Sequence, residues 1–209
     1  MGKYFGTDGV RGRANEGLTL DMSIKIGQYL GWYYSKSGRH ARILIGKDTR
    51  LSGDMFELGL SAGATSMGAQ VYLLGVCPTP SISYLIQKER FDCGIMVSAS
   101  HNPYYDNGIK VFNDRGEKME EFVLLKIEDY MDGKTQLPLA TGDKIGELIE
   151  WEDGLEIYMS WLKETVPVDL TGMHICVDLA NGSATSTAAE TLDALGATVE
   201  AINNSPNGI

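Results

Sequence analysis

The residue types most suited to chemistry are concentrated in residues 97–110, which read Val-Ser-Ala-Ser-His-Asn-Pro-Tyr-Tyr-Asp-Asn-Gly-Ile-Lys. This stretch offers two hydroxyls, an imidazole, two amides and an ammonium group, carried by Ser98, Ser100, His101, Asn102, Asn107 and Lys110. An apolar run at 93–97 precedes it and a β-type run at 108–112 follows it, which predicts a polar loop between two strands. Such a loop can bind a phosphate or present a nucleophile. The same residue types also favour an ordinary connecting turn, so composition alone leaves both interpretations open.

His101 directly follows Ser100 and is a candidate base for that hydroxyl. Neighbouring side chains of an extended segment, however, point to opposite faces. On the residues alone, a structural histidine is therefore favoured over a Ser100–His101 catalytic pair.

Two motifs together resemble a known family. The string Ser98-Ala99-Ser100-His101-Asn102-Pro103 is followed by Asn107-Gly108-Ile109-Lys110, and the N-terminus carries Phe5-Gly6-Thr7-Asp8-Gly9-Val10-Arg11-Gly12. Both are similar to motifs of the α-D-phosphohexomutases, which move a phosphoryl group between two oxygens of a hexose phosphate. The match is closest to the branch that acts on glucosamine phosphates. A branch acting on mannose or glucose phosphates remains the alternative, because the family's sugar-reading loop does not occur in these residues.

The resemblance implies a role for each residue of the site. Ser100 would carry the phosphoryl group and exchange it through a sugar 1,6-bisphosphate, which serves as intermediate and activator. The N-terminal loop would bring Arg11 to this serine, where its planar fork can hold a phosphate. Lys110 would act on the attacking hydroxyl, either as a general base or as a fixed positive charge. The remaining members of the predicted site are His101 in the catalytic set and the residues expected to position the substrate and its phosphate, Asn102, Asn107 and Arg50.

The resemblance also implies magnesium. An oxygen of the phosphate on Ser100 would be one metal ligand. The family's other ligands lie in an Asp-rich loop, and no Asp-x-Asp-x-Asp-Arg string occurs in these 209 residues. We therefore expect the chain to be an N-terminal part of a longer enzyme and to be inactive alone.

Composition is that of an ordinary soluble globular protein, with 43% hydrophobic and 22% charged residues. The net charge of -10 argues against nucleic acid or an anionic membrane as a partner. The expected partner is a small sugar phosphate, and a homodimer is left open. An odd number of cysteines in or beside apolar runs, namely Cys77, Cys93 and Cys176, predicts reduced core thiols and a cytoplasmic location. The chain shows no signal-peptide pattern and no apolar run near the roughly 18 residues that a membrane span needs.

Hydrophobic periodicity predicts an α/β fold with a mixed, mostly parallel sheet flanked by helices. The expected strands are 42–46, 69–76 and 92–97, and the expected helices are 19–36, 54–67, 81–88 and 119–131. The run at 108–112 would add an antiparallel strand at the edge of this sheet.

A second, similar α/β domain is expected to begin after the Gly- and Pro-punctuated segment at 133–146. A connector helix is predicted at 150–164, followed by strands at 173–179 and 198–202 around a helix at 184–195. These patterns divide the chain into family domain 1 at residues 1–140, a linker and connector helix at 141–165, and a partial domain 2 at 166–209. The Asn181-Gly182-Ser183 turn could cradle a phosphate, although a structural turn is favoured.

A function of another class also fits the central loop. Ser100 could be the phosphosite of a non-catalytic module that binds phosphate or docks a partner. A phosphoryl group that exchanges with a sugar phosphate would indicate the enzyme, and one that never exchanges would indicate the module.

Overall fold

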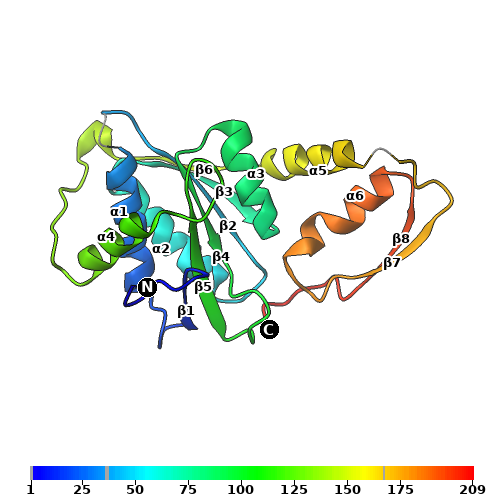
Figure 1. Ribbon diagram of the computed structural model, residues 1–209, viewed down its shortest axis with the longest axis horizontal. Coiled ribbons are helices and arrows are strands. Elements are labelled where there is room, and N and C mark those ends of the chain that lie inside the picture. Colours follow the sequence, from blue (N-terminus) through cyan, green and yellow to red (C-terminus); the bar gives the residue numbers. More distant parts are fainter. Residues whose placement is uncertain (1, 36–37, 167) are drawn as a thin grey trace.

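The structure is a computed structural model that describes residues 2–35, 38–166 and 168–209. It contains a large α/β unit and a smaller α/β unit toward the C-terminus (Figure 1). The six strands of the large sheet run in the order β1-β5-β4-β2-β3-β6. Their bounds are β1 Val10–Arg13, β2 Arg42–Lys47, β3 Gln70–Val76, β4 Cys93–Val97, β5 Asp106–Phe112 and β6 Leu148–Glu150.

Helices cover both faces of this sheet. Figure 1 shows one group of helices on one side of the sheet and another group on the other side. The first group is α1 Leu20–Tyr34, α2 Gly53–Thr65 and α4 Glu121–Met131, and the second is α3 Thr79–Glu89 and α5 Gly154–Thr165. The predicted fold class, a mixed and mostly parallel sheet flanked by helices, is confirmed. The expected end of α1 at Lys36 lies outside the described residues.

The strands divide their side chains between two cores. Ile43 and Ile45 of β2 pack into the core under α1, α2 and α4, whereas Leu44 packs into the core under α3 and α5. All five residues of β4 are buried. Burying a Val, Leu or Ile side chain contributes about 1.5–3 kcal/mol. This packing holds β4 in position, and with it the start of the loop that follows.

Strand direction gathers several loops at one edge of the sheet. β2 is parallel to both β3 and β4, whereas β5 is antiparallel to β4. The carboxyl ends of β2, β3 and β4 therefore lie at the same edge as the start of β5. Ligands of open α/β sheets bind beyond such an edge.

The structure corrects the predicted borders of the sheet. β5 is antiparallel, as expected, but it is not an edge strand, because β1 pairs with its other side and places Arg11 opposite Gly108. At the opposite border, β6 pairs in parallel with β3 and was not expected. Because β6 occupies residues 148–150, α5 begins at Gly154 and not at residue 150. Both new strands have too few residues to show a periodic pattern.

The smaller unit contains two parallel strands, β7 His174–Asp178 and β8 Thr198–Ile202, and the helix α6 Ala188–Ala194. The expected helix at 184–195 is split, because Ser183–Ser186 form a separate 3-10 turn. Along β7 the residues alternate between exposed and half-buried. Cys176 falls on an exposed position, so the prediction of a core thiol is wrong there, whereas Cys77 and Cys93 are buried.

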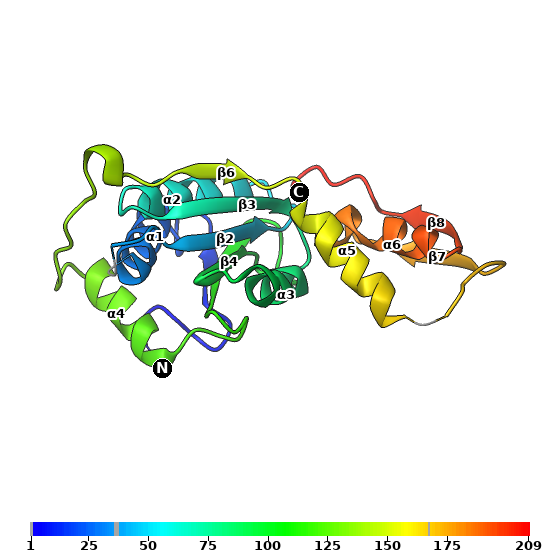
Figure 2. The ribbon, with the colours of Figure 1, turned by 90° about the horizontal axis from the view of Figure 1, so that it is seen from above.

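Figure 2 shows β6, β3, β2 and β4 one beside the next, with the C-terminal segment returning from the smaller unit to the large one. None of the helices in the described part of the chain is both long and apolar enough to cross a membrane.

Candidate active site

The serine loop, which comprises residues 98–105, connects β4 to β5 and borders a cavity of about 740 Å³. Most of the predicted site residues line this cavity, namely Arg11, Arg50, Ser100, His101, Asn102 and Lys110. Asn107, the remaining one, is fully buried in β5. Residues that are far apart in the sequence therefore meet at one place.

Ser100 is exposed and has a left-handed backbone, with φ of 59°. This conformation costs a residue other than glycine roughly 1–2 kcal/mol, so neighbouring bonds must hold it. The Ser98 hydroxyl accepts a hydrogen bond from the Ser100 N–H at 3.0 Å. Arg50 donates to the Ser100 carbonyl oxygen at 2.8 Å. Both peptide groups of Ser100 are thus fixed while its side chain lies at the cavity.

Arg50 is the clamp of the serine loop. Its two terminal nitrogens donate to four backbone carbonyl oxygens, those of Ser100 at 2.8 Å, Asn102 at 2.9 Å, Pro103 at 2.6 Å and Asp106 at 3.2 Å. Its Nε donates to Asp48 at 2.9 Å. These bonds use all five N–H groups of the guanidinium. Arg50 therefore positions the loop and has no N–H left over for a phosphate.

Two other cations share one face of the sheet beside the loop. Arg11 lies opposite Gly108, and Lys110 is two residues further along β5, so both side chains project to the same side. A Cβ at Gly108 would lie 3.0 Å from Cγ of Arg11 and 2.6 Å from the Ser98 carbonyl oxygen, so only glycine leaves room here. The Arg11 Nε is buried and has no hydrogen-bond partner among the described residues. An unused donor on a guanidinium is suited to a phosphate oxygen.

Lys110 has one carboxylate neighbour that the sequence alone does not single out. Its Nζ lies 3.5 Å from Oδ1 of Asp8, which sits in the turn before β1. The Lys110 side chain is half-buried, with 28% of its surface exposed. The only sequence signal for Asp8 is its place in the N-terminal motif.

The two amides belong to the framework of the loop. Asn102 donates to the Asp106 carboxylate at 3.0 Å. The Asn107 side chain donates to the Ser52 hydroxyl at 2.9 Å and accepts from the Gly108 N–H at 2.8 Å. The His101 ring is exposed and, within the described residues, makes no hydrogen bond to Ser100.

Lys47, at the end of β2, is committed to acidic partners. It pairs with Asp54 at 2.7 Å and with the buried Glu57. Burial raises the pKa of Glu57, and the ion pair with Lys47 opposes that rise. Arg11 and Lys110 therefore carry the positive charge that faces the cavity from the sheet.

The smaller unit forms the other wall of the cavity, through residues 180–183 and 207–209. Thr49 donates its hydroxyl hydrogen to the Asn181 carbonyl oxygen at 2.6 Å. The Leu51 N–H donates to the Gly208 carbonyl oxygen at 3.0 Å. Residues 48–51 thus contact the smaller unit and, through Arg50, the serine loop. Sequence reasoning missed Thr49, whose only signal is its place beside Arg50.

The turn at 180–183 is held by local bonds. Ala180 and Asn181 both have φ of 49°. The Asp178 carboxylate accepts hydrogen bonds from the Asn203 side chain and from the Ala180 N–H, each at 2.9 Å. These two bonds hold the pKa of Asp178 below its usual value. The contacts are those of a structural turn.

The described residues contain no group of three or more His, Cys, Asp or Glu side chains able to hold a metal ion. A magnesium ion needs several oxygen ligands. These residues could supply only one part of such a site, through a phosphate on Ser100.

Comparisons by sequence and by structure relate the chain to known proteins. The family model described as phosphoglucomutase/phosphomannomutase, alpha/beta/alpha domain I, matches residues 2–138. The chain is 51% identical to a phosphoglucosamine mutase of Lachnoclostridium phytofermentans over 210 residues, which is all of this chain and 47% of that protein. A phosphoglucosamine mutase of Lachnospira eligens is also 51% identical, with the same coverage.

A solved structure has the same fold. It is a phosphoglucomutase/phosphomannomutase family protein of Burkholderia thailandensis, with a TM-score of 0.81 and 23% identity, covering 98% of this chain and 44% of that one. The chain belongs to the phosphoglucomutase/phosphomannomutase family. It spans about half the length of the curated relatives that it matches.

Proposed function

We propose that this chain supplies the phosphoserine part of the active site of a phosphoglucosamine mutase. The observation that carries this proposal is the exposed Ser100, fixed in a left-handed conformation beside a cavity that Arg11 and Lys110 also line. A fixed oxygen with cations around it suits phosphoryl transfer, in which positioning and charge stabilisation supply most of the catalysis.

In the proposed reaction, the phosphoryl group on the Ser100 oxygen moves to the free hydroxyl of a sugar phosphate. The P–O bond to Ser100 breaks, a P–O bond to the sugar forms, and the product is a sugar 1,6-bisphosphate with an unmodified serine. The bisphosphate then returns its other phosphoryl group to Ser100. The net result is glucosamine 6-phosphate converted to glucosamine 1-phosphate, or the reverse, with Ser100 phosphorylated again.

The residues around Ser100 have separate roles in this scheme. Arg11 would hold phosphate oxygens through its unused Nε–H and the rest of its fork. Lys110 would stand at the attacking hydroxyl, either accepting its proton or acting as a fixed charge, with Asp8 as its partner. Arg50, Asn102 and Asn107 would hold the loop, and His101 would contact the phosphate or the sugar from the exposed side.

The metal enters this proposal only as a partner of Ser100. Magnesium, when bound, would neutralise charge on the phosphoryl group being transferred. Its other ligands would come from carboxylates that the described residues do not gather.

The sugar preference rests on the curated relatives, since the proteins of Lachnoclostridium phytofermentans and Lachnospira eligens are named phosphoglucosamine mutases at 51% identity. Glucose or mannose phosphate is the alternative substrate. We also propose the wider setting predicted from the sequence: family domain 1 at 1–140, a linker and connector helix at 141–165, part of domain 2 at 166–209, and a cytoplasmic enzyme without nucleic-acid or membrane partners.

The test is a side-by-side assay of the full-length protein with glucosamine, glucose and mannose phosphates, run with wild type and Ser100→Ala. We expect the glucosamine phosphates to be turned over fastest and Ser100→Ala to lose at least about 1,000-fold, roughly 4 kcal/mol of barrier. A protein that retains a phosphate on Ser100 but turns over none of the three sugars would instead be a phosphate-dependent binding module.

A further inference from the structure

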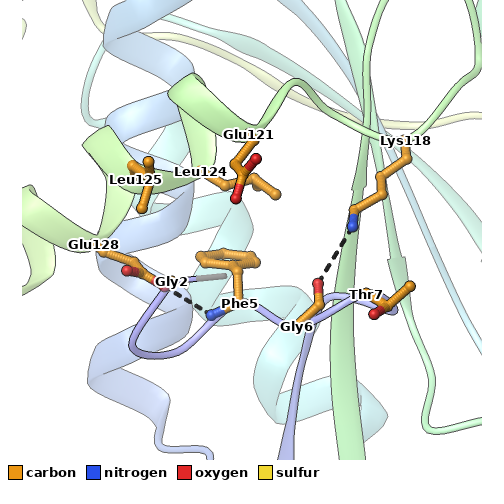
Figure 3. A pocket seen from close by; sticks show the side chains of 9 residues that line it. All are labelled: Gly2, Phe5, Gly6, Thr7, Lys118, Glu121, Leu124, Leu125 and Glu128. Carbon is orange, nitrogen blue, oxygen red and sulfur yellow. Dashed lines mark hydrogen bonds between the residues drawn. The ribbon is translucent and has the colours of Figure 1, made fainter.

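A buried carboxylate on α4 holds the start of the chain. Glu128 accepts hydrogen bonds from three consecutive backbone N–H groups, those of Lys3 at 2.8 Å, Tyr4 at 2.7 Å and Phe5 at 2.8 Å. Figure 3 shows Glu128 beside Gly2 and Phe5, where the N-terminal arm runs along the helix. Hydrogen bonds to an ionised acceptor are the stronger kind, so this is a substantial anchor.

The residues around Glu128 pack closely against this contact or add to it. A Cβ on Gly2 would lie 2.2 Å from Oε1 of Glu128, so the arm passes very close to the carboxylate. Phe5 is buried in the core under α4. Asp132, one turn further along, accepts from Lys3 and from the Tyr4 hydroxyl, each at 2.8 Å. Burial by itself would raise the pKa of Glu128, but the bonds from Phe5, Tyr4 and Lys3 prevail and hold that pKa below its usual value.

The anchored arm leads directly into the candidate active site. The Gly6 N–H donates to the Gly9 carbonyl oxygen at 3.0 Å and closes a turn that contains Asp8. Gly9, with φ of 86°, lies against β5, where a Cβ would come within 2.2 Å of the Ile109 carbonyl oxygen. Asp8 reaches Lys110, and two residues after Gly9 the strand β1 places Arg11 opposite Gly108.

The arm thereby links the two faces of the sheet. Phe5 and Val10 pack in the core under α1, α2 and α4. Arg11 projects to the other face, because successive residues of a strand point to opposite sides. Between the anchored residues 3–5 and Arg11 the chain has one turn and the first residue of β1, a four-residue edge strand. A short edge strand is weakly held by its own ladder, so the anchor at its start matters for its register.

We propose that Glu128 is a positioning residue for Arg11, acting through the N-terminal arm from the far face of the sheet. This inference rests on the proposed function, since it assigns Arg11 to the phosphate. Glu128 lines the small hollow of Figure 3 and not the catalytic cavity, so it acts without touching the substrate.

The test is a double-mutant cycle in the full-length protein between Glu128→Gln and Arg11→Met. Gln keeps the size of the side chain but gives up the charge and one acceptor oxygen. With Arg11 present, we expect Glu128→Gln to lower kcat about tenfold, the usual scale for losing a charge-assisted contact. In the Arg11→Met background the same substitution should lower kcat less than about twofold, because there is no guanidinium left to misplace.

The control is Asp129→Asn, at the neighbouring position on the same helix. The Asp129 carboxylate pairs with Lys134 at 3.0 Å and Lys126 at 3.6 Å, both on the helix or just after it. Its loss should leave kcat within about twofold of wild type, the range expected for an exposed ion pair.

A second readout needs no substrate, which separates failure of this proposal from failure of the proposed function. Amide hydrogen exchange should become faster at residues 3–5 and along β1 in Glu128→Gln, and unchanged there in Asp129→Asn. Unchanged exchange at residues 3–5 in Glu128→Gln would show that Glu128 does not hold the N-terminal arm. An equal fold-loss of kcat with and without Arg11 would overturn the positioning role and leave Glu128 as a contributor to folding alone.

Discussion

Two loops face the same cavity and are held in different ways. The serine loop follows β4, a strand buried at every position, and a guanidinium from another element grips four carbonyl oxygens in and beside it. The turn at 180–183 follows β7, whose residues alternate between exposed and half-buried. Apart from the bond from Thr49, its hydrogen bonds come from neighbouring residues of the smaller unit. Both contain residues with positive φ, so backbone conformation alone does not tell them apart.

The difference indicates that the two walls of the cavity have different roles. The serine loop is preorganised by contacts that reach across the sheet, as a reacting oxygen requires. The turn at 180–183 is tied to the large unit through the Thr49–Asn181 hydrogen bond, with the Leu51–Gly208 bond beside it. Few contacts join the two walls, so relative motion of the units is the natural expectation. The fixed wall, which carries Ser100, thus faces a wall that is joined to it through these two hydrogen bonds.

Among the changes that compare the two walls, loosening the fixed wall is expected to have the largest effect. Arg50→Lys leaves one ammonium in place of a planar fork and cannot reach four carbonyl oxygens. We expect turnover of the full-length protein to fall roughly 100-fold, about 2.7 kcal/mol of barrier. Arg39→Lys is the matched control, since Arg39 is exposed and pairs with Asp92 away from the cavity. The measurement is steady-state kcat. Near-normal turnover in Arg50→Lys would show that the hydrogen bonds of Arg50 to the serine loop are not needed for the reaction.

A pair of glycine substitutions compares the two loops directly. Gly108→Ala would push a methyl group to 2.6 Å from the Ser98 carbonyl oxygen, whereas at Gly182 the nearest atom is 3.4 Å away and φ is −94°. Overpacking typically costs about 1–3 kcal/mol, so Gly108→Ala should lose roughly tenfold or more in turnover. Gly182→Ala should stay within about twofold, or roughly 0.4 kcal/mol. Equal effects in the two variants would contradict the difference in rigidity.

A smaller effect is expected at the link between the walls. Thr49→Val removes the hydrogen bond to Asn181, at a cost of about 1 kcal/mol. We expect faster amide exchange around residues 180–183 and about a fivefold change in turnover. Thr65→Val is the control, since it loses a hydroxyl that bonds only within α2. Equal amide exchange and equal turnover in Thr49→Val and Thr65→Val would show that the Thr49–Asn181 hydrogen bond does not contribute to turnover.

The smallest effect is a pH-dependent one at the turn. Hydrogen bonds to Asp178 lower its pKa, so they stabilise the turn above the unfolded pKa of about 3.9 and are lost as pH falls through the folded value. The protection factor of the Ala180 amide, which corrects for the intrinsic pH dependence of exchange, should therefore fall on acidification, and Asp178→Asn should remove that fall. The Ser100 amide serves as an internal reference, because its acceptor is the neutral Ser98 hydroxyl. A pH response in Asp178→Asn equal to wild type would contradict the assignment.

Much of the fold could be read from the sequence, because the central strands and their helices have strong periodicity. The strands β2, β3 and β4 and the helices α1 to α4 lie close to the predicted ranges. The edge strands β1 and β6 could not be read, since they are four and three residues long and are defined by distant partners. The predicted burial of Cys176 was also wrong, because an apolar run does not reveal how much of a two-stranded sheet is covered.

The candidate site divides in the same way. The motif located Ser100, Lys110 and Arg11, and the structure places all three at one cavity. The sequence predicted Arg50 as a positioning residue but not its partners, because these are backbone carbonyl oxygens that any residue would provide. The anchor at Glu128 is equally hidden, since it joins positions more than 120 residues apart.

The most direct test of the central claim is a single-turnover experiment on the full-length protein labelled with phosphate at Ser100. On mixing with unlabelled glucosamine 6-phosphate, we expect the label to leave the protein and appear first in the sugar bisphosphate, at the rate of turnover. If the sugar phosphates interconverted while the label stayed on Ser100, the hydroxyl would not be the carrier and the account would be wrong.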